Sequence, residues 1–382
     1  MKSNRQKALR VAGIFAGIGG FEVGLERAGH RSVLLCENDL AAQAVLREHF
    51  KNRTFIDDVA EIDVVPREVD LLAAGFPCQD LSQVGRTQGL NGKKSTIVSH
   101  VFRILKRTQV PWVLIENVPF MLQLHQGAMI AHIVRSLEEL GYRWAYRTVD
   151  TRAFGIPQRR QRVFLLASIN SDPARVLLGQ DIGPRESAEA DGPPCGFYWT
   201  EGNRGLGWAV GCVPTLKGGS TVGIPSPPAI WMPNGRIMTP DIRDAERLQG
   251  FGADWTAPAE EISTRGSRWR LVGNAVTTAV SEWLGLALRI SAANTRKDAC
   301  ELDVRQGWPK AAFGEKGRRY SAGVSMWPVG KEMTRIDKFL RYPCRPLSRK
   351  AAEGFYRRLM ASALHYPSRF AHDLKRHIDE SP

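Results

Sequence analysis

The sequence predicts an α/β protein with a doubly wound, mostly parallel sheet, a smaller loop-rich domain and a basic C-terminal extension. Three observations lead to this fold class. Strand-like and helix-like patterns alternate through the first 170 residues, periodicity then fades up to about residue 236 where Gly and Pro cluster, and positive charge gathers after residue 290. The chain has 382 residues, which is enough for two or three domains.

Six short runs rich in β-branched or aromatic residues are expected to form strands. They are residues 11–15, 32–36, 69–74, 112–116, 143–149 and 162–167. Helical patterns are found at residues 21–28, 40–50, 97–107, 128–140, 242–249 and 275–288. Gly29 and Gly141 stand where two of these helices should end. Sheets of this kind bind ligands beyond the carboxyl ends of their strands, so functional residues are expected there.

The composition limits the compartment and the class of protein. Hydrophobic residues make up 43% and charged residues 24%, and no apolar stretch approaches the roughly 20 residues of a membrane span. Six cysteines without a CxxC pair favour a reducing compartment over a disulfide framework or a zinc site. We therefore expect a cytoplasmic protein with no bound metal and no membrane contact.

The charge of the chain predicts a polyanionic partner. The net charge is +14 and the isoelectric point is about 9.8, and nucleic acid is the commonest partner for such a protein. Residues 291–382 hold 19 Lys and Arg against 10 Asp and Glu. A solvated basic surface with no special role is the alternative for that segment.

A glycine-rich segment follows the first expected strand and precedes the first expected helix. Residues 15–21 read FAGIGGF, and glycines at such a junction let a ligand approach the backbone. The third glycine of a dinucleotide fingerprint is replaced by Glu22, which disfavours NAD. Glu37 ends the second strand, where it can accept hydrogen bonds from ribose hydroxyls, and residues 58–59 could contact an adenine edge. An exposed loop acid is the alternative reading of Glu37.

Two further strand ends carry a thiol and a carboxyl. Cys78 lies in GFPCQ after the third expected strand, and Glu116 ends the fourth. A thiolate is a strong nucleophile, and a carboxylic acid beside a ring nitrogen can supply the proton that makes the ring electrophilic. The basic cluster QRRQR at residues 158–162 can bind carbonyl oxygens, phosphate or the Glu116 carboxylate.

In chain order, the motifs resemble those of the DNA cytosine-5 methyltransferases. The matching set comprises FAGIGG (15–20), Glu37, Asp58, GFPCQ (75–79), ENV (116–118), QRRQR (158–162), RLQGF (247–251) and GNAV (273–276), and it spans residues 11–284. The resemblance implies the S-adenosylmethionine-dependent methyltransferase fold. It also implies that residues 1–170 plus 268–290 are the catalytic and cofactor-binding domain and 171–267 the target-recognition domain, which leaves 291–382 as an extension of unknown role.

The resemblance implies a role for each motif. Cys78 adds to C6 of a cytosine, Glu116 contacts and protonates N3, and C5 takes a methyl group from S-adenosyl-L-methionine. Arg160 and Arg162 anchor Glu116, the cytosine carbonyl and nearby backbone. The residues implied to hold the cofactor are Phe15, Gly17, Ile18, Gly19, Gly20, Glu37, Asn38, Asp58, Val59, Pro77, Asn274 and Ala275.

The same chemistry requires that the cytosine leave the duplex, because C6 is inaccessible within the base stack. In the family, a loop after the Pro-Cys pair closes on the DNA, and here it would be residues 82–99. The residues expected to contact DNA are Gln79, Ser82, Arg86, Lys93, Lys94, Thr215 and Leu216. Two departures from the family pattern stand out: Gly13 replaces a common Asp, and Asp244 replaces a common Glu.

The predicted function is methylation of C5 of a flipped-out cytosine in a specific duplex DNA sequence, as part of restriction-modification or another phage-defence system. A cognate endonuclease or defence-system proteins are the expected further partners, and a monomer is expected on DNA. An RNA (tRNA) cytosine-5 methyltransferase of the DNA-enzyme-like type is the alternative, because it would share the catalytic motifs. A silent nucleic-acid-binding module, a nicotinamide oxidoreductase and a methylase of exocyclic amines each leave Cys78 or Glu116 unexplained.

Overall fold

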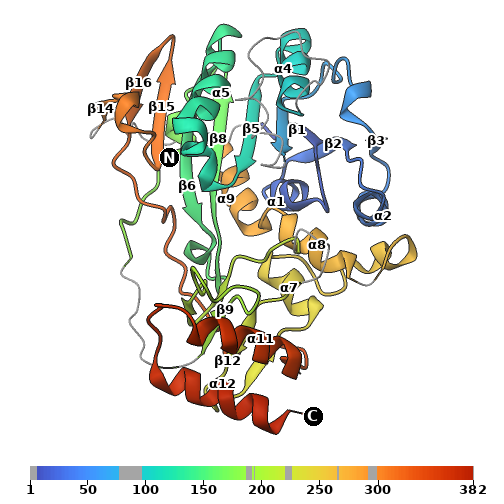
Figure 1. Cartoon of the computed structure of the whole chain (residues 1–382). Helices are drawn as coiled ribbons and strands as arrows, with labels where there is room; N and C mark the ends of the chain where they lie inside the picture. The colour runs from blue at the N-terminus through green and yellow to red at the C-terminus, as the bar shows by residue number, and fades with distance from the viewer. Residues whose placement is uncertain are drawn as a thin grey trace. The chain divides into compact units, whose positions relative to one another are not determined.

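The computed structural model describes residues 7–76, 97–185, 192, 194–219, 226–264, 266–290 and 299–381. The chain forms two compact units (Figure 1). Unit 1 comprises Met1–Asp150, Gln161–Pro184 and Val276–Gly330, and unit 2 comprises Thr151–Arg160, Arg185–Ala275 and Lys331–Pro382. These bounds differ from the expected division, because residues 291–382 are shared between the two units.

Unit 1 is built on a 10-stranded mixed sheet with the order β14-β16-β15-β6-β8-β5-β4-β1-β2-β3. Its strands are β1 Arg10–Ile14, β2 Arg31–Cys36, β3 Thr54–Ile56, β4 Leu71–Gly75, β5 Trp112–Asn117, β6 Arg143–Asp150, β8 Gln161–Ser168, β14 Cys300–Glu301, β15 Ala311–Glu315 and β16 Arg318–Ser321. Strands β1 to β5 pair in parallel, and β8 lies antiparallel between β5 and β6. The expected α/β class is confirmed, and all six expected strands are present.

Helices cover both faces of this sheet (Figure 1). Those of unit 1 are α1 Gly20–Arg27, α2 Leu40–His49, α4 Ile97–Thr108, α5 Ala128–Glu139, α6 Pro173–Leu177 and α9 Thr278–Leu288, with short 3-10 helices at Val59–Glu61, Pro119–Leu122, Leu124–Gly127 and Val304–Gln306. Helix α4 buries Val98, Val101 and Leu105, three positions that its period brings to one face. On the other face, α1 packs against α9.

The C-terminal part of unit 1 extends the sheet in a way that the sequence pattern did not predict. Strand β15 pairs antiparallel with β6, and β16 and β14 follow it outward. The expectation of a mostly parallel sheet holds for the strands that end before residue 118. Residues 300–321 add only antiparallel pairings.

Unit 2 contains a five-stranded antiparallel sheet with the order β10-β9-β12-β13-β17, and a parallel pair of β11 with β7. The strands are β7 Gln158–Arg159, β9 Cys195–Phe197, β10 Ala209–Val210, β11 Val213–Pro214, β12 Ala229–Trp231, β13 Ile237–Thr239 and β17 Arg345–Pro346. Its helices are α7 Ile242–Leu248, α8 Ser267–Asn274, α10 Ile336–Phe339, α11 Arg349–Met360 and α12 Ser368–Glu380, with 3-10 helices at Thr151–Ala153 and Ala257–Glu261. The strands are short, which agrees with the weak periodicity there.

The segment that contains α8 and α9 is unusually long and apolar. Among the described residues, Ser267–Leu288, which contains α8 and α9, is long and apolar enough to cross a membrane. Of its apolar window, 78% is buried within the protein, as is usual for core helices.

Candidate active site

The glycine-rich segment forms a turn between β1 and α1 with unusual backbone angles. Phe15, Gly17 and Gly19 have φ values of 56°, 57° and 88°. A positive φ in a non-glycine residue such as Phe15 typically costs about 1–3 kcal/mol and clusters at functional sites. The Phe15 ring meets the Phe76 ring edge to face at 6.4 Å, which helps to hold it. Among the described residues, a Cβ on Gly17 would meet nothing within 4 Å, so the backbone of this glycine faces open space there.

Glu37 connects this turn to the end of β2. Its Oε2 accepts a hydrogen bond from the Gly17 N–H at 2.8 Å, and its Oε1 accepts from the N–H groups of Asn38 and Asp39 at 2.9 Å each. Burial raises the pKa of Glu37, and these backbone hydrogen bonds oppose that rise. A carboxylate has about four acceptor positions, so three are occupied and about one is left for a ligand hydroxyl. A carboxylate oxygen with one free acceptor position fits a hydroxyl group of a ribose.

Most of the other residues of unit 1 that were predicted to hold the cofactor have buried or already engaged side chains, so they could contact it mainly through backbone atoms. Asp58 caps the short helix Val59–Glu61 by accepting the Ala60 N–H at 2.8 Å. Ile18 is 1% exposed and Val59 8% exposed, whereas Asn38 is exposed. A Cβ on Gly20 would overlap the Val276 carbonyl, so this glycine permits close packing of α1.

Gly13, the first departure from the family pattern, has a structural explanation. A Cβ at residue 13 would overlap Oε1 of Glu22, which reaches from α1 toward β1. Glu22 is 1% exposed, and within the described part of the chain neither carboxyl oxygen has a hydrogen-bond partner. Burial raises the pKa of Glu22 to about 8. The sequence reading missed this carboxyl, although a Glu inside the glycine motif was the signal that could have drawn attention to it.

Glu116 lies where the thiol-bearing segment begins. It pairs with Gly75 across β4 and β5, and its Oε2 lies 3.8 Å from the position of a Cβ on Gly75, three residues before Cys78. Arg162, on the neighbouring β8, places its Nε 3.0 Å from Glu116 Oε1. The pair is close but not aligned as a hydrogen bond, because Oε1 has no hydrogen-bond partner among the described residues. Glu116 is only 7% exposed, so its carboxyl and the Arg162 guanidinium meet largely away from solvent.

Asn117 fixes the same strand end. Its side-chain amide donates to the Phe76 carbonyl at 3.1 Å, and its Oδ1 accepts from the Val118 N–H at 2.9 Å. Both bonds hold the backbone next to Glu116. The ENV motif contained this residue, but the sequence did not assign it a role.

In unit 2, Arg160 binds backbone carbonyls. It is 1% exposed and donates to Leu216 at 3.2 Å, Gly273 at 3.1 Å and Ala275 at 2.7 Å. It therefore connects the QRRQR, Thr215-Leu216 and GNAV motifs. Ala275 is buried, whereas Asn274 is exposed.

Gln158, a buried residue that the sequence did not single out, strengthens the same junction. Its Oε1 accepts the Leu216 N–H at 3.0 Å, and its Nε2 donates to the Leu248 carbonyl at 2.8 Å. Thr215 donates to the Arg159 carbonyl at 2.8 Å, and the Leu216 side chain is only 2% exposed. Leu216 can thus offer DNA little of its side chain.

The remaining predicted site residues are outside the part of the chain that the structure describes. They are Pro77, Cys78, Gln79, Ser82, Arg86, Lys93 and Lys94. Among the described residues, no group of three or more His, Cys, Asp and Glu side chains is arranged as metal ligands would be.

Comparison with known proteins identifies the family. The family model described as C-5 cytosine-specific DNA methylase matches residues 9–190. The Type II methyltransferase M2.BsuMI of Bacillus subtilis (strain 168) is 45% identical over 385 residues, which covers 96% of this chain and 98% of that protein. The chain belongs to the C-5 cytosine-specific DNA methylases. The Type II methyltransferase M.MspI of Moraxella sp is 27% identical to this methylase over 317 residues. The alignment covers 76% of this chain and 74% of M.MspI.

Two solved structures share the fold of this methylase. Schizosaccharomyces pombe (S. pombe) Dnmt2 methyltransferase has a TM-score of 0.53 at 16% identity and covers 73% of this chain and 98% of its own. Entamoeba histolytica methyltransferase EhMeth has a TM-score of 0.52 at 17% identity, and the match covers 74% of this chain and 98% of the EhMeth chain. The family model and the relative at 45% identity, rather than the likeness in fold, show a DNA cytosine-5 methyltransferase of the Type II restriction-modification type.

Proposed function

We propose that this methyltransferase modifies a flipped-out cytosine in a specific duplex DNA sequence through a transient bond between Cys78 and C6. The observation that carries the proposal is the Glu116 carboxylate, which lies beside Gly75 and therefore close along β4 to the Pro-Cys segment. A thiol and an acid at adjacent strand ends are what nucleophilic addition to a pyrimidine requires.

The steps follow from the chemistry of these two groups. The Cys78 thiolate adds to C6 while the Glu116 carboxyl gives a proton to N3, which makes C5 nucleophilic. S-adenosylmethionine supplies an electrophilic methyl group for C5. A base then removes the C5 proton, the C6–sulfur bond breaks to release the Cys78 thiolate, and the N3 proton returns to Glu116. Arg162 keeps the Glu116 carboxyl oriented throughout.

The residues of unit 1 suit the cofactor. The open space at Gly17 lets a ligand approach the backbone, and Glu37 has an acceptor position left for a ribose hydroxyl. Asp58 and Val59 follow β3 and would border the adenine. In unit 2, Asn274 and Ala275 are the further residues proposed for this role.

The experiment uses labelled S-adenosylmethionine with duplex DNA or RNA. We expect label in DNA with the wild-type protein, none with Cys78→Ser, and undiminished label with Cys300→Ser, the matched control at an exposed cysteine. Label in RNA alone, or full activity of Cys78→Ser, would overturn the proposal. A duplex that contains 5-fluorocytosine should become covalently trapped, and bisulfite sequencing should then locate the recognised site.

The setting of the enzyme is part of the proposal. A chromosomal DNA substrate implies a location in the cytoplasm, on the nucleoid. A restriction-modification methylase protects DNA from cleavage by a cognate endonuclease, so such an endonuclease is the expected partner. We infer that it acts on DNA as a monomer. Sedimentation of the protein with a short duplex would test this, because a two-to-one complex is incompatible with it.

A further inference from the structure

The last part of the chain supplies seven of the 13 described buried residues in one hydrophobic cluster of unit 2. Phe355 of α11 and Phe370 of α12 are fully buried, and their rings lie 4.9 and 5.1 Å from that of Phe197 on β9. Trp231 of β12 donates its Nε1–H to the buried Asp373 carboxylate at 2.9 Å. Residues 331–381 are therefore an integral part of this unit, the one that contains the expected target-recognition region.

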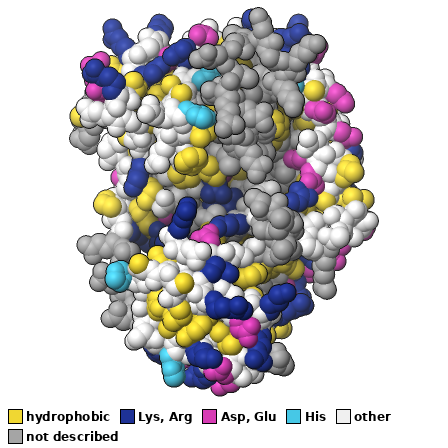
Figure 2. All heavy atoms as spheres, in the orientation of Figure 1, with side chains coloured by type: hydrophobic (Ala, Val, Ile, Leu, Met, Phe, Trp, Pro, Cys, Tyr) yellow, Lys and Arg dark blue, Asp and Glu magenta, His cyan; other side chains and the backbone are white. Residues whose placement is uncertain are grey.

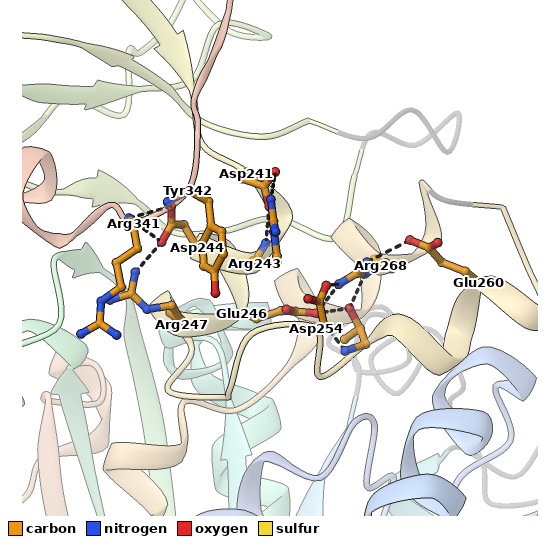
Figure 3. A network of polar contacts seen from close by, with 11 residues as sticks. Asp241, Arg243, Asp244, Glu246, Arg247, Asp254, Glu260, Arg268, Arg341 and Tyr342 are labelled. Atoms are coloured by element: carbon orange, nitrogen blue, oxygen red, sulfur yellow. Dashed lines mark hydrogen bonds and ion pairs between the residues drawn. The ribbon is translucent and has the colours of Figure 1, made fainter.

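Residues 331–381 also form hydrogen bonds with the five-stranded sheet of unit 2 and with α7. Strand β17 pairs with β13 so that Arg345 lies opposite Thr239, whose hydroxyl donates to the Arg345 carbonyl at 3.2 Å. Asp244, the second departure from the family pattern, accepts the N–H groups of Arg341 and Tyr342 at 3.1 and 3.0 Å (Figure 3). Its carboxylate is fully buried and holds the C-terminal segment directly.

A hollow opens at this junction. It is lined by Pro227, Thr239, Pro240, Asp241, Ile242, Trp269 and Arg345. The Asp241 carboxylate is already engaged by Arg243, whose Nε lies 2.8 Å from its Oδ1. Arg345 is exposed, and no hydrogen bond or ion pair of its guanidinium is found within the described ranges. Arg345 also interacts electrostatically with the Asp241 carboxylate, so the hollow presents an exposed guanidinium beside an acid that Arg243 already pairs.

The surroundings of Arg345 favour a polyanion. Residues 331–382 contain 12 Lys and Arg against 6 Asp and Glu. Figure 2 shows Lys and Arg side chains over the lower part of the molecule, where α11 and α12 lie, together with hydrophobic side chains and some Asp and Glu. A guanidinium binds phosphate oxygens with two parallel hydrogen bonds.

We propose that Arg345 binds a backbone phosphate of the substrate duplex, which makes residues 331–381 a DNA-contacting part of the recognition unit. This proposal rests on the proposed function. A phosphate contact positions the duplex and carries no sequence information itself, so Arg345 should affect affinity for every duplex to a similar degree.

The experiment measures binding to a duplex that carries the mapped methylation site over a series of salt concentrations. Each phosphate contact contributes about 0.9 to the slope of log affinity against log salt. For Arg345→Ala we expect the slope to fall by about 0.9 and affinity to drop about tenfold, with KM for DNA raised and kcat little changed. Arg345→Lys should keep most of the slope.

Lys375→Ala is the matched control, because it removes an equal charge from an exposed residue that is paired with Asp379 at 2.8 Å. It should leave the slope unchanged. An unchanged slope in Arg345→Ala, or an equal fall in both variants, would overturn the inference. If the wild-type enzyme methylates no duplex at all, the proposed function fails instead, and the two failures are thus distinguishable. Circular dichroism of each variant verifies the fold.

Discussion

The Nε of Arg162 lies 3.0 Å from Oε1 of Glu116 across the pairing of β5 with β8. This contact predicts a positioning role for Arg162. In Arg162→Ala the carboxyl loses its fixed orientation, and small misplacements of catalytic groups lower kcat by about a hundredfold. Single-turnover methylation should show that fall with DNA affinity little changed. Arg143→Ala, which removes an exposed arginine of the adjacent strand, should keep full activity, and equal losses in both variants would contradict the prediction.

Gly17 is predicted to matter for cofactor approach more than for stability. Ala at this position adopts a strained positive φ, at a cost of about 1 kcal/mol, and its methyl group enters the open space beside the turn. Isothermal titration with S-adenosylmethionine should show binding weakened at least tenfold. Gly141→Ala is the matched control, because Gly141 also has a positive φ, 84°, and no atom within 4 Å of a Cβ. Equal cofactor affinity in both variants would count against the site.

Glu22 predicts a dependence of stability on pH. Its pKa is raised to about 8 in the folded protein by burial, with smaller contributions from Glu26 and Glu37, so the folded state holds a proton that the unfolded state releases near pH 4.5. Stability from this group is thus complete at low pH and is lost as pH rises toward 8. The hydrogen-exchange protection factor of the α1 amides, which corrects for the base-catalysed intrinsic rate at each pH, should fall over this window in the wild type.

Replacement of Glu22 by Gln should remove that dependence and stabilise unit 1 at pH 8 by roughly a few kcal/mol, since one pKa unit corresponds to about 1.4 kcal/mol. At pH 5 the two proteins should exchange at similar rates. Glu48→Gln, at an exposed position, serves as the control. A wild-type protection factor that stays constant from pH 5 to pH 8 would refute the assignment.

We expect replacement of Arg268 by Ala to lower the stability of unit 2 strongly. It is 4% exposed and lies between Glu246, Asp254 and Glu260 at 2.9 to 3.1 Å (Figure 3). Arg268→Ala leaves the fully buried Glu246 carboxylate without its cation, which typically costs about 3–5 kcal/mol. Limited proteolysis should cut unit 2 much faster in this variant. Arg305→Ala breaks an exposed pair with Asp303 and should change nothing measurable.

The sequence by itself determined the α/β class, six of the eight described strands that end before residue 169, and the position of Glu116 at a strand end. These follow from local periodicity and from motifs at strand ends, which are properties of a few neighbouring residues. The family assignment also followed from the ordered motifs, and the comparisons confirm it.

Only the tertiary structure decided which partners these residues have. Arg160 and Arg162 look equivalent in sequence, yet one binds three carbonyls of unit 2 and the other pairs with Glu116 in unit 1. Residues 291–382 looked like one extension, but β15 pairs with β6 and β17 pairs with β13. Such pairings join residues more than a hundred positions apart, and they depend on which edges and apolar faces remain uncovered after the local elements have formed.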